Sequence, residues 1–402
     1  MPAHVHIGTG KFGLGFVGYF SNNLSLSTAF LNRTPKIDSS RIRNEKLQMR
    51  REYLIDYYDT GERDTVRFEC LEFFGGTQEH TDKSVGLIAD ENTKLVTTTV
   101  GESQLSEVAP LIAQGLQQRS NDRPLFIIAC ENGHRCSTQL GSQVKGILGS
   151  TEHAGIFVDC VVDQICNRIN SSEELVAVSA ENYREWIIAD ASEELTNYLC
   201  HSQIRFVPSE HLKFYEMRKL WLVNGFHLAL AILGVTTVGG GTNTRIAEIL
   251  ERKGSDLADQ VEGVQIELVD ALVYKKGSIF RPDDLFEFVE QTKQRFKASP
   301  DSCERILRDA LLSPERIAQI TRDFGNNLGQ NKRLSDVFSQ HLYECVFSFF
   351  KKVQDRLYEP VLINSDRDKS VYLPYVLMQL VPFLVKQGKH LISDDASAED
   401  IL

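Results

Sequence analysis

The feature that most constrains the fold is a glycine-rich turn near the start of the chain. Residues 4–7, His-Val-His-Ile, alternate like a short strand, and an apolar, helix-like segment follows the turn as far as Phe20. A GxGxxG pattern between a strand and a helix predicts dinucleotide binding, because the glycines permit a tight turn, a close approach of pyrophosphate and close helix packing. The pyrophosphate is expected at the amino end of the helix. The predicted cofactor-binding residues here are Gly8, Thr9, Gly10, Lys11, Phe12 and Gly13.

The end of the next expected strand, residues 26–31, bears on the choice of cofactor. NAD-binding proteins usually present Asp or Glu there to the ribose hydroxyls, but no acidic residue occurs between Gly13 and Asp38. Asn32 and Arg33 follow the strand instead. A guanidinium can bind the 2'-phosphate of NADP, which a carboxylate would repel. We therefore expect Asn32 and Arg33 to contact the cofactor and NADP to be favoured slightly over NAD.

Strands and helices alternate through the first half of the chain. Apolar, β-branched runs suit buried parallel strands, and residues 105–118 have helical periodicity. The less regular residues 44–90 contain two strand-like runs, 53–58 and 65–71, which predict an inserted hairpin. The other expected strands are 4–7, 26–31, 94–101, 124–129, 155–165, 175–179, 186–189 and 204–208. This alternation favours a doubly wound sheet.

The second half of the chain has helical periodicity and few strand patterns. The expected helical segments are 209–234, 243–276, 283–297, 301–312, 314–323, 334–357 and 371–387. Pro208 marks the predicted domain boundary. We predict an α/β protein with an N-terminal Rossmann-type doubly wound sheet over residues 1–207 and a mostly α-helical substrate and catalytic domain over residues 208–402. The acidic end, residues 393–400, is expected to be mobile.

Composition argues against several classes of partner. The net charge of -11 disfavours nucleic acid and anionic membrane surfaces. The eight cysteines are scattered without a CxxC pair, so neither a disulfide framework nor a metal site is expected. No secretory signal is recognised, and polar residues or proline interrupt the longest apolar runs. These features predict a cytoplasmic protein with a small-molecule substrate, and they leave its oligomeric state open.

An apolar segment after the predicted boundary contains three polar side chains, Lys219, Asn224 and His227. Burying such groups without partners costs several kcal/mol. At about 100° per residue on a helix, Asn224 lies roughly 140° from Lys219, with His227 between them at about 80°. Taken alone, the segment is more typical of a buried helix with satisfied polar groups than of a binding site.

Polar residues also follow the predicted buried strands. Thr99 and Val100 end the strand 94–101, at the edge where an open α/β sheet binds ligand. Asn132 follows the strand 124–129, and its amide can donate to a developing alkoxide without titrating. Asp159 and Asp163 interrupt the strand 155–165, where anchoring a loop is the simpler role and orienting a lysine is the alternative.

These stretches together resemble the zinc-independent, long-chain polyol dehydrogenases. The resemblance spans roughly residues 1 to 280. The matching features are the glycine turn with additional glycines at 15 and 18, the segments 127–132, 157–165 and 185–187, and the K-x4-N-x2-H spacing of Lys219, Asn224 and His227. The resemblance implies hydride transfer between a nicotinamide cofactor and a secondary alcohol of a polyol or polyol phosphate.

The resemblance also implies a role for each residue. Lys219 is the general base, and its pKa would have to fall by about 3 units from about 10.4 through desolvation and the nearby nicotinamide cation. Asn132 and Asn224 hold the reacting oxygen, and losing one such donor typically costs about 3 kcal/mol in the barrier. His227 positions a neighbouring hydroxyl, and Asp163 orients the base or its partners. Asn132 is expected to face Lys219 and Asn224 across a cleft near Pro208.

Two departures from the family pattern leave the substrate open. Phe30 stands at the acidic ribose-binding position. The family's C-terminal basic cluster has only loose counterparts, namely Arg322, Lys332, Arg333 and the pair Lys275 and Lys276. The enzymatic alternatives are therefore oxidation of mannitol and reduction of a hexuronate such as fructuronate or tagaturonate. A catalytically inactive dinucleotide sensor is the alternative outside enzymology, and no Cys/His cluster has the spacing of a zinc-dependent site.

Overall fold

The computed structural model describes residues 2–35, 38–119, 123–149, 155–171, 174–237, 244–252, 256–273, 278–303, 305–306, 362–363 and 371–372. The chain divides into two compact units, residues 1–216 and 217–402. The division falls inside helix α7 (Ser209–Arg218), whereas the sequence placed the boundary at Pro208. Lys275, Lys276, the basic candidates between 322 and 340 and the acidic end lie outside the described residues.

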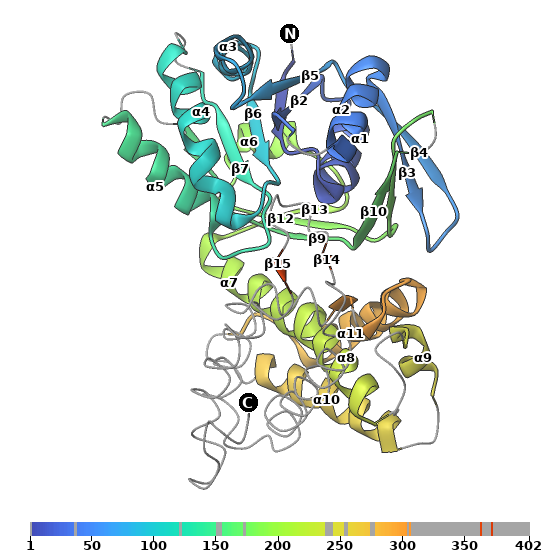
Figure 1. The fold of residues 1–402 in the computed structure, drawn as a ribbon. Helices are drawn as coiled ribbons and strands as arrows, with labels where there is room; N and C mark the ends of the chain where they lie inside the picture. Colours follow the sequence, from blue (N-terminus) through green and yellow to red (C-terminus); the bar gives the residue numbers. More distant parts are fainter. Residues whose placement is uncertain are drawn as a thin grey trace, which may run out of the picture. The chain divides into compact units, whose positions relative to one another are not determined.

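Six parallel strands form the central sheet of the first unit (Figure 1). In the order in which they lie, they are β5 (Cys70–Phe74), β2 (Thr28–Arg33), β1 (His4–Ile7), β6 (Leu95–Thr98), β7 (Phe126–Ala129) and β8 (Ile156–Phe157). The chain runs outward from β1 through β2 to β5, then returns to β6 on the other side of β1. Such a reversal is the point where open α/β sheets bind ligand. The sheet confirms the predicted doubly wound fold.

Successive side chains of β1 lie on opposite faces of this sheet. Val5 and Ile7 are buried with α3 (Gln78–Ala89), α4 (Leu105–Gln118) and α5 (Cys136–Leu148), which pack side by side (Figure 1). The opposite face is covered by the π-helical segment η1 (Gly13–Val17) and by α1 (Gly18–Asn23), whose Phe16 and Phe20 join the second buried cluster. Helix α4 occupies the predicted residues 105–118.

Two smaller sheets complete the first unit, although the sequence predicted a single sheet and one hairpin. The hairpin is confirmed as β3 (Glu52–Tyr57) and β4 (Arg63–Arg67), and β11 (Ala177–Ala180) and β10 (Cys166–Asn170) extend it to four strands. The strands β9 (Cys160–Asp163), β12 (Glu185–Ala189) and β13 (Ile204–Val207) form a separate sheet. The remaining elements of the unit are α2 (Asp38–Arg50), η2 (Glu102–Gln104) and α6 (Glu193–Tyr198).

Three predictions for this unit were wrong in detail. Residues 70–71, assigned to the hairpin, begin the edge strand β5. The strand predicted at 155–165 is two strands in different sheets, β8 and β9, because the chain leaves the central sheet between them. Part of the irregular region 44–90 is helical, as α3 and the end of α2. The first two errors share a cause, since strand propensity does not specify which neighbour a strand pairs with.

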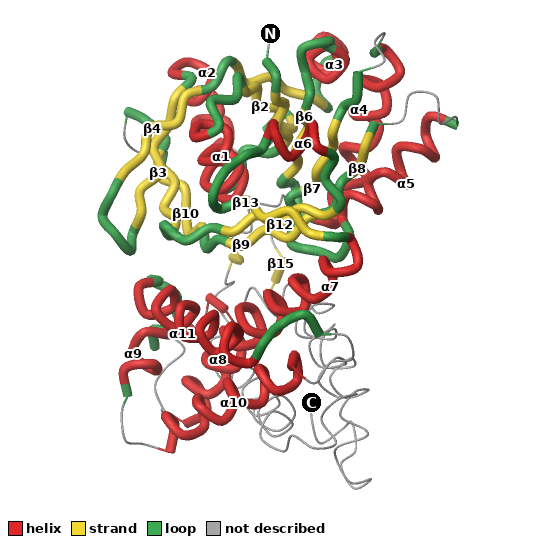
Figure 2. Tube along the Cα trace, turned by 180° about the vertical axis from the view of Figure 1, so that it is seen from behind, coloured by secondary structure: helices red, strands yellow, loops and turns green. Residues whose placement is uncertain are grey.

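The described part of the second unit is mostly helical, as Figure 2 shows. Helix α7 continues through the π-helical segment η3 (Lys219–Gly225) into α8 (Phe226–Thr237), which contacts α9 (Ile246–Glu251) and α10 (Asp256–Val273). Helix α11 (Pro282–Ala298) contains the predicted segment 283–297. The predicted segment 243–276 is instead two helices, α9 and α10, and the backbone of Arg252 after α9 is extended.

Two short strands, β14 (Leu362–Ile363) and β15 (Val371–Tyr372), pair antiparallel. The first two residues of the helix predicted at 371–387 are therefore a strand, because they pair with a neighbouring segment. The other helices predicted beyond residue 306 lie outside the described residues.

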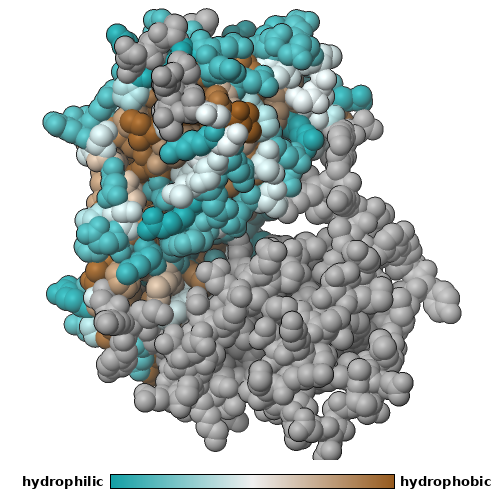
Figure 3. All heavy atoms as spheres, turned by 90° about the vertical axis from the view of Figure 1, so that its left-hand side faces the viewer, coloured by the Kyte–Doolittle hydropathy of each residue, from teal (hydrophilic) through white to brown (hydrophobic). Residues whose placement is uncertain are grey.

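The surface of the first unit is largely hydrophilic on the face that Figure 3 shows, with apolar areas between polar residues. Among the described residues, no helix has both the length and the apolar character needed to cross a membrane.

Candidate active site

The glycine turn joins β1 to η1 and has the shape that phosphate binding requires. Gly8 has a φ of +121°, a conformation that L side chains rarely adopt. A Cβ on Gly13 would lie within 3.0 Å of the Gly8 carbonyl, the Thr99 hydroxyl and the ring of His6. A Cβ on Gly10 would meet nothing within 4 Å, so backbone there is open to a ligand. The residues present therefore fit a dinucleotide pyrophosphate at the start of the helix.

The other predicted cofactor residues lie at the same edge of the sheet. Asn32 and Arg33 end β2, and Thr99 and Val100 follow β6. Because β2, β1 and β6 are parallel neighbours, their carboxyl ends bring these residues and the glycine turn to the strand-order reversal. The structure thus brings together every residue that the sequence proposed for the cofactor.

The sequence interpretation overlooked a buried carboxylate, Glu131. Its side chain accepts hydrogen bonds from the backbone N–H groups of Val100 and Gly101, each at 2.8 Å, and from the hydroxyl of Thr98 at 2.7 Å. Burial raises the pKa of Glu131, and these three hydrogen bonds oppose that rise. Glu131 thereby joins the end of β7 to the loop after β6. The run of polar residues after strand 124–129 indicated a possible site, but it did not reveal that Glu131 binds the loop after β6.

Asn132 follows Glu131 at the end of β7 and is exposed at the ligand-binding edge of the sheet. The chain then turns sharply, and a Cβ on Gly133 would lie within 3.0 Å of Glu102 and of the sulfur of Cys136. Asn132 therefore lies between a buried, hydrogen-bonded carboxylate and a closely packed glycine.

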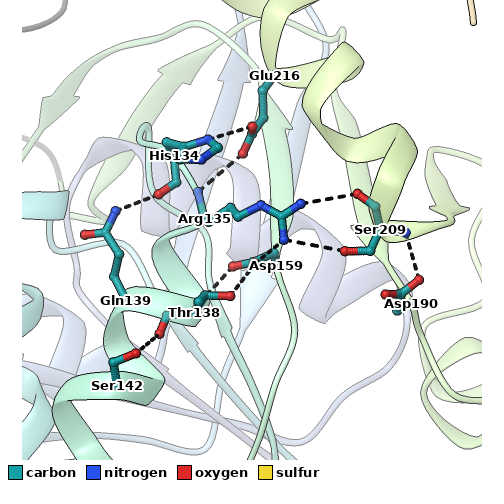
Figure 4. A network of polar contacts seen from close by, with 9 residues as sticks. All are labelled: His134, Arg135, Thr138, Gln139, Ser142, Asp159, Asp190, Ser209 and Glu216. Carbon is teal, nitrogen blue, oxygen red and sulfur yellow. Dashed lines mark hydrogen bonds and ion pairs between the residues drawn. The ribbon is translucent and has the colours of Figure 1, made fainter. Parts of the chain in front are cut away.

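A polar network connects this turn to helix α7, as Figure 4 shows. The carboxylate of Glu216 hydrogen-bonds the ring of His134 at 2.8 Å and accepts the backbone N–H of Arg135 at 3.3 Å. The Arg135 side chain, from a residue with a φ of +44°, donates to the carbonyl and hydroxyl oxygens of Ser209 at 3.4 and 3.5 Å. Glu216 precedes Lys219 by three positions in the sequence. These hydrogen bonds connect Glu216 to the turn that carries Asn132.

The two aspartates of the strand predicted at 155–165 are both buried. Asp159 accepts hydrogen bonds from the backbone N–H and the hydroxyl of Thr138, at 2.9 and 2.6 Å (Figure 4). This is the loop-anchoring role that the sequence favoured. Asp163 ends β9, and its expected role in orienting the base stays a prediction.

In the second unit, Lys219 and Asn224 lie in the π-helical segment η3, where both are half-buried. A π-helix pairs residues five apart, as the Phe226 N–H donating to the Trp221 carbonyl illustrates. Lys219 and Asn224 are also five residues apart and therefore lie about one turn apart on the same side. The separation of about 140° between Lys219 and Asn224 was therefore wrong. It assumed the spacing of an α-helix, whose turn contains fewer residues than that of a π-helix. Single-turn π segments often occur at functional sites.

His227 lies on α8, one residue beyond the π turn, in a largely buried position. Its ring stacks on Phe296 with centroids 4.1 Å apart, and its Nε2 is 3.6 Å from the Asp301 carboxylate, which also pairs with Arg305. Burial lowers the pKa of His227 to about 4, although Asp301 opposes the shift. Within the described part of the chain Nε2 has no hydrogen-bond partner. A neutral imidazole in this state can receive or donate one further hydrogen bond.

The structure places the predicted catalytic residues in two sets. Asn132 and Asp163 belong to the first unit, and Lys219, Asn224 and His227 belong to the second. The expectation that Asn132 faces Lys219 and Asn224 stays a prediction, because it joins residues of both units.

Comparisons with known proteins agree with these features. Residues 2–198 match the model of the mannitol dehydrogenase Rossmann domain. The chain is 29% identical over 329 residues to a mannitol-1-phosphate 5-dehydrogenase of Exiguobacterium sp. AT1b, covering 80% of each chain. It is 30% identical over 238 residues to the enzyme of that name from Shouchella clausii, covering 57% of this chain and 59% of the relative.

Among solved structures, the fold resembles Pseudomonas fluorescens mannitol 2-dehydrogenase in a ternary complex with NAD and D-mannitol. The TM-score is 0.62 at 16% identity, covering 85% of this chain and 79% of that one. This likeness supports the fold, and the sequence matches support the relationship. With its nucleotide-binding half matched to the mannitol dehydrogenase Rossmann domain and a relative matched over 80% of its length, the chain is similar to mannitol dehydrogenases in both sequence and fold.

Proposed function

We propose that the protein is a zinc-independent polyol dehydrogenase that uses a nicotinamide dinucleotide. The reaction is hydride transfer to or from a secondary alcohol of a sugar alcohol or its phosphate, of the mannitol 1-phosphate and fructose 6-phosphate type. The observation that carries the proposal is the π-helical turn that places Lys219 and Asn224 on one side. It occurs in a chain whose glycine turn fits a dinucleotide and whose relatives are named mannitol-1-phosphate 5-dehydrogenases.

We assign each proposed catalytic side chain one role in this reaction. Lys219 takes the hydroxyl proton during oxidation and returns it during reduction. A nicotinamide dinucleotide, when bound, would supply the hydride chemistry. The amide groups of Asn132 and Asn224 donate hydrogen bonds to the reacting oxygen, whose negative charge grows as the proton leaves. The neutral imidazole of His227 hydrogen-bonds a neighbouring hydroxyl of the substrate. Asp163 orients the base or its partners.

The cofactor is proposed to lie along the carboxyl edge of the central sheet. The glycine turn from Gly8 to Gly13 holds the pyrophosphate, and the loop containing Thr99 and Val100 borders the nucleotide. Arg33 at the end of β2 supports a preference for NADP, because its guanidinium can pair with the 2'-phosphate. NAD is the alternative cofactor.

Replacing Lys219 tests the proposed base. We expect Lys219→Ala to retain cofactor binding and to lose turnover by a factor of about 100 to 10,000, the contribution typical of general base catalysis. Stopped-flow absorbance at 340 nm would measure turnover, and fluorescence titration would measure cofactor binding. Lys213→Ala, which removes an exposed lysine from the preceding helix α7, is the matched control and should remain active. Near-normal turnover in Lys219→Ala would refute the assignment.

A substrate screen separates the proposed reaction from its rivals. Fructose 6-phosphate, fructose, fructuronate and tagaturonate would each be tested with NADH and NADPH. Preference for the phosphorylated ketose supports the proposal, whereas preference for fructose or a hexuronate identifies the mannitol 2-dehydrogenase or hexuronate reductase activity. Cofactor binding without turnover of any polyol or ketose would identify an inactive sensor. We also propose that the protein has no nucleic-acid partner, on the basis of its net charge of -11. The scattered cysteines without a CxxC pair support a reducing, cytoplasmic location.

A further inference from the structure

An ion pair joins the end of a strand to the first turn of a helix at the proposed cofactor edge. The guanidinium of Arg33, the last residue of β2, pairs with the carboxylate of Glu107 in the first turn of α4. The two residues are 74 positions apart in the sequence. The sequence around the end of β2 contains no carboxylate. Helix α4 supplies one there, the side chain of Glu107.

The topology places this ion pair at the reversal of strand order. β2 lies on one side of β1, and β6, which leads into α4, lies on the other. The pair consequently connects the two sides of the edge from which the glycine turn emerges. A dinucleotide bound at this turn would place its adenosine ribose at the end of β2, next to both charges.

The Arg33 and Glu107 side chains are 52% and 41% exposed. Ion pairs this exposed contribute at most about 1 kcal/mol, so a ligand can exchange with either partner. A ribose 2'-hydroxyl can donate to Glu107 and accept from Arg33 without separating them. A 2'-phosphate carries about -1.5 to -2 charges at pH 7, so it competes with Glu107 for the guanidinium and is repelled by the carboxylate.

We propose that Glu107 is a specificity-determining residue that limits NADP binding by holding Arg33 and presenting a carboxylate to the ribose. Arg33 attracts the 2'-phosphate of NADP, whereas Glu107 repels it. The preference for NADP over NAD is therefore small. This inference rests on the proposed use of a nicotinamide dinucleotide and adds the residue that sets the choice between its two forms.

Equilibrium titration of the full chain with NADH and NADPH tests the proposal without relying on turnover. Glu107→Gln should tighten NADPH binding on the order of tenfold, because one like charge is removed beside the phosphate, and should leave NADH binding within about twofold. Arg33→Gln should weaken NADPH binding by a similar factor. In the double variant the effect of Glu107→Gln should shrink, since the two residues act through one another.

Glu174→Gln is the matched control, because Glu174 also forms an exposed ion pair with an arginine, Arg50 at the far end of α2. It should change the affinity for neither cofactor. If both cofactors bind but Glu107→Gln leaves their affinity ratio unchanged, the inference is overturned while the proposed function stands. If the wild-type chain binds neither cofactor, the proposed function itself fails.

Discussion

At the scale of single residues, the first strand contains two buried histidines where apolar residues are usual. His4 and His6 share the hydroxyl of Thr97, each at 2.7 Å, and the far nitrogen of His6 hydrogen-bonds the Thr99 hydroxyl at 3.0 Å. The Thr99 side chain lies directly beneath the glycine turn. The histidines thus supply hydrogen-bond partners inside the sheet and support the turn that is proposed to hold the cofactor.

These histidines predict loss of stability in mild acid. Burial lowers the pKa of His4 to about 3 and holds the pKa of His6 well below its usual 6.5. The unfolded chain therefore binds more protons below pH 6.5, and stability present above that pH is lost as the pH falls toward the folded pKa values. Each histidine should cost about 2 kcal/mol of unfolding free energy between pH 7 and pH 5, at about 1.4 kcal/mol per pH unit below 6.5.

Guanidinium unfolding at several pH values would measure this loss. His4→Gln retains a group that can hydrogen-bond Thr97 but does not titrate, so its stability should fall less steeply with acid than that of the wild type. The exposed His134 provides the control variant His134→Gln. Equal acid slopes for His4→Gln and the wild type would contradict the prediction.

At the scale of elements, the helix after the glycine turn is shaped by its packing against the hairpin sheet. The hydroxyl of Tyr53 on β3 donates to the Leu14 carbonyl within η1 at 2.7 Å. A Cβ on Gly18 would overlap that hydroxyl, and a Cβ on Gly15 would lie 2.8 Å from the sulfur of Cys166. The two glycines noted in the sequence are therefore needed for close contact between layers.

Gly18→Ala should destabilise the protein by about 1 to 3 kcal/mol, the usual range for overpacking a well-packed core. Tyr53→Phe removes the hydroxyl that the new methyl group would meet, so the double variant should lose less than the sum of the two single changes. Urea unfolding of the four proteins would measure the coupling. Gly86→Ala is a suitable control, because a Cβ there meets nothing within 4 Å. Strictly additive losses would argue against this contact as the cause.

At the scale of the whole molecule, the first unit has the components of an independent domain. Among its described residues, three buried apolar clusters are formed by residues between Val5 and Ile204. Helix α7 begins beside them, where the Ser209 N–H donates to Asp190 at 2.8 Å. The proposed cofactor residues also lie within this unit, whereas Lys219 belongs to the other.

A fragment of residues 1–218 should therefore unfold cooperatively and bind the nicotinamide dinucleotide about as tightly as the full chain. It should have no turnover, because it lacks Lys219. Calorimetry and fluorescence titration would test folding and binding, with full-length Lys219→Ala as the control that lacks only the base. A fragment that neither unfolds cooperatively nor binds cofactor would show that the second unit is required for the first.

The sequence alone was sufficient for the doubly wound fold and the glycine turn. Both depend on short-range patterns: strands of apolar residues, a helix over 105–118 with a matching period, and glycines at fixed spacing. It also identified Lys219, Asn224 and His227 as a set, by a resemblance in spacing. The sequence did not predict which strands residues 70–71 and residues 155–165 pair with. A run of strand-forming residues can join any of several sheets.

Only the tertiary structure decided how the polar groups are partnered. Glu131 meets the backbone of Val100 and Gly101, and Glu107 meets Arg33, through contacts between residues 30 or more positions apart. The π turn that brings Lys219 and Asn224 to one side also departs from the period that sequence patterns assume. Periodicity records which residues are buried along one element, whereas hydrogen bonds and ion pairs depend on which elements become neighbours. The sequence therefore determined the doubly wound fold and the candidate residues, and the tertiary structure determined the partners that hold them.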